Sequence, residues 1–240
     1  MSEKEPVRRN LEAQPTDYVA SAAKAIVGAA PIVGSLLSEL AGTLIPNQRL
    51  DRIAKFAKEL EGRLAALDQM ILKNKLTDEN ATDLLEEGLR QAARSLSDER
   101  RRYLASVVAN GIDSQDIEYF ESKHVLRILG ELNDVEIIWL RSYLVRTMDG
   151  DKEFREKHKE VLRPIPMVMA SPDPIRDKAA LQKSYKNHLV RLGLLRERYD
   201  TNPSKGPELD MSGELKVRGY DLTGFGQMVL RQIGLLKGRM

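Results

Sequence analysis

The sequence predicts a mainly α-helical protein, with an N-terminal helical bundle followed by a helical domain that carries a small β-hairpin. The first observation is composition: 42% apolar and 31% charged residues with only 5% aromatics favour helices packed on aliphatic seams. The second is the helical spacing of apolar residues over 49–130. The third is a loop-like stretch, residues 202–213, between two short strand-like runs. At 240 residues the chain is long enough for two cores.

The N-terminal region divides into a polar arm and an apolar stretch. Residues 1–16 contain two prolines and show no apolar period, which predicts a flexible arm. Residues 18–46 are apolar or small, and Lys24 and Glu39 are their only charges. Pro31 lies near the middle, which predicts one helix on either side of it, over about 17–29 and about 31–44.

A row of small residues runs through the apolar stretch at intervals of four positions: Ala30, Gly34, Ser38 and Gly42. On a helix such a row lies along one side and lets another helix approach closely. The stretch has two interpretations, an inner hairpin of a soluble bundle or a segment that inserts into a membrane. In composition it resembles the glycine-zipper segments of membrane-acting toxins and cell-death effectors, a resemblance that implies the second interpretation.

The following region carries an apolar seam with steps of three and four residues: Leu50, Ile53, Ala57, Leu60, Leu64, Leu67 and Ile71. This spacing predicts one long helix with a coiled-coil-like seam. Further amphipathic periods predict helices over about 79–95, 97–111 and 117–129. Residues 17–130 therefore form the predicted bundle, and the seam indicates self-association or partner binding.

Capping and breaking signals organise the start of the C-terminal domain, predicted at 131–240. Asn133 and Glu136 have the spacing of a capping box just before an apolar run, which predicts a helix start. Four prolines within residues 163–174 predict a loop or an extended edge. Helical spacing then returns over about 175–192.

Two stretches of this domain carry a family resemblance, LQKSYKNHLVRLGLLRERYD (181–200) and ELKVRGYDLTGFGQMVLRQIG (214–234). They predict a helix that ends at Leu-Gly-Leu-Leu, a strand, a loop, a second strand over 214–218, and a last helix capped by Thr223. This order resembles bacterial winged-helix domains over about residues 131–236. The glycine would turn the third helix into the wing.

The resemblance implies candidate binding residues. In a winged helix that binds DNA, the third helix enters the major groove, and its candidates here are Lys183, Lys186, Asn187 and Arg191. Arg198 and Lys205, beside and within the wing, would contact phosphate. From Lys178 to Arg198 the sequence has six basic residues and one acidic residue. Winged helices also bind proteins, and a lysine-rich helix face is also typical of plain solvent exposure, so the partner is left open between nucleic acid and protein.

The sequence shows no pattern of residues typical of catalysis or metal binding. It has no cysteine, and His124, His158 and His188 fall far apart on different predicted elements. Walker A, G-x-G-x-x-G and G-x-S-x-G motifs do not occur. We therefore expect no enzyme activity, no cofactor and no bound metal.

These observations predict a non-enzymatic, cytoplasmic interaction protein. The lack of cysteine suits a reducing compartment, and residues 1–17 lack the basic-then-apolar layout of a signal peptide. The bundle would form homo-oligomers or bind a partner, and the C-terminal domain would dock nucleic acid or protein. The alternative is a membrane-acting bacterial toxin or defence effector, which would associate with a membrane on activation by inserting residues 18–46.

Overall fold

A computed structural model gives the fold of the protein. It describes residues 30, 33–35, 37–39, 49–67, 69–113, 116–145, 151–165, 172–199, 201–202, 206–209, 213 and 215–236. The chain forms two compact units, residues 1–122 (unit 1) and residues 123–240 (unit 2). The boundary between the two units lies within helix α7 (Asp116–Glu131). The domain boundary predicted from the sequence, after Gly130, lies in the same helix.

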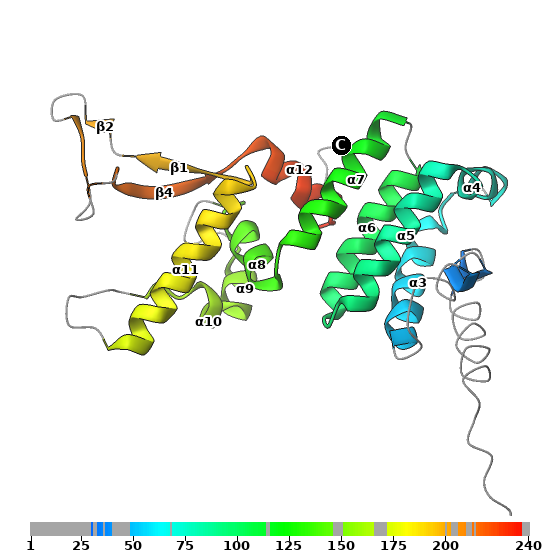
Figure 1. Cartoon of the computed structure of the whole chain (residues 1–240), viewed down its shortest axis with the longest axis horizontal. Coiled ribbons are helices and arrows are strands. Elements are labelled where there is room, and N and C mark those ends of the chain that lie inside the picture. Colours follow the sequence, from blue (N-terminus) through cyan, green and yellow to red (C-terminus); the bar gives the residue numbers. More distant parts are fainter. Residues whose placement is uncertain are drawn as a thin grey trace, which may run out of the picture. The chain divides into compact units, whose positions relative to one another are not determined.

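Unit 1 is built of helices (Figure 1). They are α3 (Leu50–Leu64), α4 (Gln69–Leu76), α5 (Glu79–Arg94), α6 (Asp98–Asp113) and the first part of α7. The three longer helices α3, α5 and α6 pack against one another, and α4 packs on α5 and α6. The helices predicted over 79–95, 97–111 and 117–129 are confirmed, each with its ends shifted by a few residues at most.

The predicted apolar seam forms the buried face of α3, but the helix ends sooner than predicted. Four seam residues are fully or almost fully buried in unit 1: Ile53, Ala57, Leu60 and Leu64. The chain leaves the helix after Leu64, and the backbone N–H of Leu67 donates to the Leu64 carbonyl at 3.0 Å in a turn. A single helix reaching Ile71 is therefore wrong. The apolar seam of α3 is therefore buried by other parts of the same chain. Self-association stays a prediction, but the seam no longer supports it.

Part of the predicted apolar stretch packs into unit 1. Ala30, Val33 and Leu37 are fully buried, and Gly34 is buried as well. The backbone N–H of Val33 donates to the Glu61 carboxylate of α3 at 3.2 Å, which holds this short helical stretch against α3. The half-buried Ser38 donates its hydroxyl proton to the carbonyl of Gly34 at 2.7 Å. The described part of the small-residue row is therefore buried or half-buried in unit 1.

The remaining predictions for the N-terminal region lie outside the described residues. These are the arm over 1–16, most of the two helices around Pro31, and Gly42. Among the residues that the structure describes, no helix is both long and apolar enough to cross a membrane.

Unit 2 combines helices with a hairpin. After α7 its elements are α8 (Asp134–Ser142), α9 (Lys152–Lys157), α10 (Lys159–Leu162), α11 (Asp173–Arg191), β1 (Leu195–Tyr199), β2 (Thr201–Asn202), β3 (Gly206–Pro207), β4 (Val217–Leu222) and α12 (Gly224–Gln232). The predicted capping box is present: the Glu136 N–H donates to the Asn133 side chain at 2.9 Å, and the Asn133 N–H donates to the Glu136 carboxylate at 2.8 Å. The long helix α11 packs against α8 and β1 (Figure 1).

Gly193 turns α11 into β1, as the sequence predicts. Its φ of 72° lies in the left-handed region that favours glycine. The Gly193 N–H donates to the Val190 carbonyl at 2.8 Å, and the Leu194 N–H donates to the Leu189 carbonyl at 2.9 Å, which together form a Schellman cap. Leu189 and Leu194 are both fully buried, so the cap also fixes where the hairpin leaves the core.

Thr223 ties the last helix to this turn. Its hydroxyl accepts a hydrogen bond from the Gly226 N–H at 2.9 Å, which caps α12, and donates to the Gly193 carbonyl at 2.7 Å. A Cβ at Gly226 would collide with the carbonyl of Leu194, because α12 passes directly against the start of the hairpin. The predicted cap at Thr223 is confirmed.

β1 and β4 form an antiparallel pair, and β2 and β3 form a second, shorter pair in the region predicted as a loop. The strand predicted over 214–218 lies further along the chain, at β4. Its pairing continues through Gly219, where the Arg198 side chain covers the glycine: a Cβ there would lie 2.8 Å from the guanidinium. A mainly helical fold with a small antiparallel sheet is therefore confirmed.

Candidate functional site

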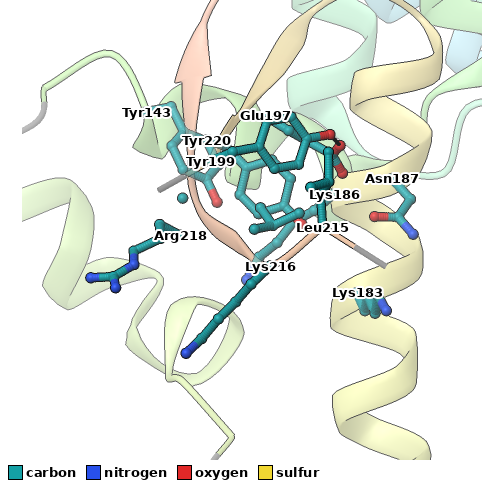
Figure 2. Close-up of a pocket in the computed structure, with 12 residues that line it drawn as sticks. Tyr143, Lys183, Lys186, Asn187, Glu197, Tyr199, Leu215, Lys216, Arg218 and Tyr220 are labelled. Atoms are coloured by element: carbon teal, nitrogen blue, oxygen red, sulfur yellow. Dashed lines mark hydrogen bonds between the residues drawn. The ribbon is translucent and has the colours of Figure 1, made fainter. Parts of the chain in front are cut away.

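A groove lies between α11 and the β1–β4 hairpin of unit 2, and we call it the α11–hairpin groove. It encloses about 1020 Å³. Figure 2 shows its walls: Lys183, Lys186 and Asn187 come from α11, Glu197 and Tyr199 from β1, and residues 215–220 from β4 and the two residues before it. Tyr143, just after α8, completes the lining.

Alternation along β1 decides which of its side chains line the groove. Glu197 and Tyr199 line it, whereas Arg198 between them belongs to the opposite side of the hairpin, because successive residues of a strand point to opposite faces. There Arg198 lies against Gly219 and lines a smaller cavity of about 310 Å³ together with Trp139 and Tyr143. The structure therefore separates Arg198 from the lysines with which the sequence grouped it.

Two cations of the groove wall share one acidic partner. Lys216 and Arg218 pair with the Glu208 carboxylate at 3.1 and 3.5 Å. The hydrogen bond from Lys216 is the main reason that the pKa of Glu208 lies below its ordinary value. All three side chains are 43–53% exposed, so these pairs are open to water. Such exposed ion pairs are weak, and a competing anion exchanges for the carboxylate at low cost.

Lys183 is a cation without such a partner. It is exposed on α11, and within the part of the chain that the structure describes it makes no hydrogen bond and no ion pair. Asn187, one helical turn further along, is exposed in the same groove. These two predicted binding residues are therefore brought together.

Lys186 has a different environment from Lys183. Its ammonium lies 4.4 Å from the centroid of the Trp139 ring and 5.9 Å from that of Tyr220. The side chain is half-buried, and burial lowers the pKa of its ammonium below 10.5. Cation–π contacts of this kind hold an ammonium against ring faces. Lys186 therefore fastens α11 to α8 and β4 through its ammonium.

Sequence reasoning did not select the three tyrosines of the groove, Tyr143, Tyr199 and Tyr220. The rings of Tyr143 and Tyr220 meet edge-on at 6.0 Å, and burial raises the pKa of both. Tyr199 is 38% exposed, and the hydrogen bond from its hydroxyl to Glu197 raises its pKa. Glu197 and Tyr199 are two positions apart on a predicted strand, so their side chains lie on the same face of it. This spacing could have indicated Tyr199 as a groove residue.

The other predicted site residues lie elsewhere. Arg191 is exposed at the end of α11 and does not line the groove, and Lys205 lies outside the described residues. His188 contacts the buried Glu136 through Nδ1 at 2.7 Å, and the His124 ring lies 5.3 Å from that of Phe225, so both pack within unit 2. Across the described ranges there is no group of three or more potential metal ligands.

Comparison of the chain with protein-family models, with curated proteins and with solved structures gave no match.

Proposed function

We propose that the protein is a non-enzymatic binding protein that docks nucleic acid through the α11–hairpin groove. The observation that carries the proposal is Lys183, an exposed cation with no partner among the described residues, which shares an open groove with Lys216 and Arg218. Exposed cations attract phosphate oxygens and release the counterions that surround nucleic acid. Asn187 beside Lys183 has both a donor and an acceptor for base edges.

The order of elements in unit 2 supports a winged-helix interpretation of this domain. A long exposed helix, α11, leads through a glycine turn into a hairpin, and a capped helix follows. In helix-turn-helix proteins the recognition helix carries the contacts to bases. The proposal keeps α11 in that role with Lys183 and Asn187, and it assigns Lys186 to packing.

An electrophoretic mobility shift across a salt series tests the proposal, with labelled DNA and RNA as probes. Three phosphate contacts would weaken binding about 40-fold between 50 and 200 mM salt, and Lys183→Glu should lower the salt slope by about one. Lys178→Glu is the matched control, because it changes the same charge on α11 outside the groove, about 140° around the helix axis from Lys183. A wild-type protein that binds no nucleic acid at low salt would refute the proposal and favour an acidic protein partner.

A further inference from the structure

We infer that the α11–hairpin groove takes an unpaired strand of nucleic acid, one base of which stacks on the ring of Tyr199. The inference rests on the proposed function and specifies which form of nucleic acid the groove accepts.

Tyr199 offers a ring that is both accessible and fixed. It lines the groove with 38% of its surface exposed, and its hydroxyl donates to Glu197 on the same strand face. The ring of Tyr220, in contrast, already meets Tyr143 and the Lys186 ammonium. Tyr199 has no ring or cation contact of this kind among the residues that the structure describes. An exposed, oriented ring is the platform on which single-strand binding proteins stack bases.

The side chains around Tyr199 suit a strand rather than a bare anion. Lys183 on α11 and Lys216 on the hairpin line the same groove and supply charge for phosphates. Leu215, 44% exposed on the hairpin wall, adds apolar surface that suits a base and gives nothing to a phosphate. The Glu197 carboxylate repels phosphate but accepts hydrogen bonds from the exocyclic amines of bases.

A duplex does not satisfy this arrangement. Its bases are stacked on one another, so a ring face becomes available to a protein only after the base has left the stack. An unpaired strand of DNA or RNA presents its ring faces directly. The combination of one open aromatic ring with flanking cations therefore selects the unpaired strand.

Fluorescence anisotropy on the full chain tests the inference with three labelled probes: a 20-nucleotide DNA strand, the RNA strand of the same sequence, and the DNA duplex. We expect at least one single strand to bind at least tenfold more tightly than the duplex. Tyr199→Ala should weaken single-strand binding about 5- to 150-fold. Tyr199→Phe should change it less than about threefold, because the ring is kept. The control is Leu209→Ala, which removes an exposed apolar side chain that lies between β1 and β4 in the chain but outside the groove. This variant should bind the single strand as tightly as the wild type does.

The outcomes separate the inference from the proposed function. If the duplex binds as tightly as the strands, or if Tyr199→Ala binds like the wild type, the inference is overturned, and the loss caused by Lys183→Glu still supports the proposed function. If no probe binds at low salt, both fail. The emission of Trp139, the single tryptophan of the chain, checks that each variant keeps unit 2 folded.

Discussion

Replacing Thr223 with alanine is expected to destabilise unit 2, because one hydroxyl both accepts and donates a hydrogen bond there. It accepts from the Gly226 N–H at 2.9 Å at the start of α12, and it donates to the Gly193 carbonyl at 2.7 Å, with the Leu194 carbonyl at 3.1 Å as a second acceptor. Gly193 is the left-handed residue that turns α11 into β1. The hydroxyl therefore joins the last helix to the helix and strand that form the groove.

The two contacts of Thr223 give the expected magnitude. Loss of an N-cap costs about 0.5–2 kcal/mol, and loss of a hydrogen bond to a carbonyl costs about 0.5–1.5 kcal/mol. Thr223→Ala should therefore lower the free energy of unfolding of unit 2 by about 2 kcal/mol. Thr223→Ser keeps both contacts and loses one methyl group, so its cost should stay below about 1 kcal/mol.

Urea unfolding followed by the emission of Trp139 measures this difference. Trp139 is the only tryptophan of the chain and lies in the core of unit 2, so the signal does not depend on unit 1. With a denaturant slope of about 2 kcal/mol per M, Thr223→Ala should lower the urea midpoint by about 1 M. Equal midpoints for the alanine and serine variants would refute the reasoning, because the hydroxyl would then contribute nothing.

Three further predictions concern packing and charge. Gly226→Ala should destabilise unit 2 by about 1–3 kcal/mol in the same urea assay, because its Cβ meets the backbone carbonyl of Leu194, which no rotamer change relieves. Lys186→Met should change stability at pH 7 by no more than about 1 kcal/mol, because lost cation–π attraction and removed ammonium burial oppose each other. Burial lowers the pKa of Lys186, so the unfolded chain binds the Lys186 proton more tightly than the folded chain does. The stability of the wild type relative to Lys186→Met should therefore rise as the pH approaches 10.5. A difference between the urea midpoints of the two proteins that falls over this pH range would contradict the prediction. Gly34→Leu should lower the stability of unit 1 by about 1–3 kcal/mol, measured by far-ultraviolet circular dichroism, and unchanged stability would argue against tight packing of the small-residue row.

The sequence was sufficient wherever a local rule decides the structure. The capping box at Asn133, the glycine turn at Gly193 and the cap at Thr223 each depend on side-chain and backbone groups within a few residues. Their types and spacing are visible in the chain, and the structure has all three. The amphipathic periods of α5 and α11 were informative for the same reason, since one face of each helix meets a core.

Prediction failed where a distant partner decides. The seam of α3 continues in the sequence beyond Leu64, but the chain turns there so that α4 packs on α5 and α6. The second strand was predicted over 214–218, but β4 runs on through Gly219, which pairs with Arg198 of β1 and is covered by its side chain. The role of Lys186 depends on Trp139, which lies 47 positions earlier in the chain. No local pattern contains such pairings.

The contrast between Lys183 and Lys186 determines how binding experiments on this groove should be designed. Charge reversal at Lys183 changes an exposed side chain that has no partner among the described residues, so a loss of affinity reports a lost contact with the ligand. Charge reversal at Lys186 places a carboxylate against the ring faces of Trp139 and Tyr220, whose π electrons repel it, and loosens α11 from α8 and β4. A loss of binding in that variant would reflect a deformed groove, and a shifted Trp139 emission should accompany it. A variant that changes both lysines would mix the two effects, so Lys183 must be tested alone.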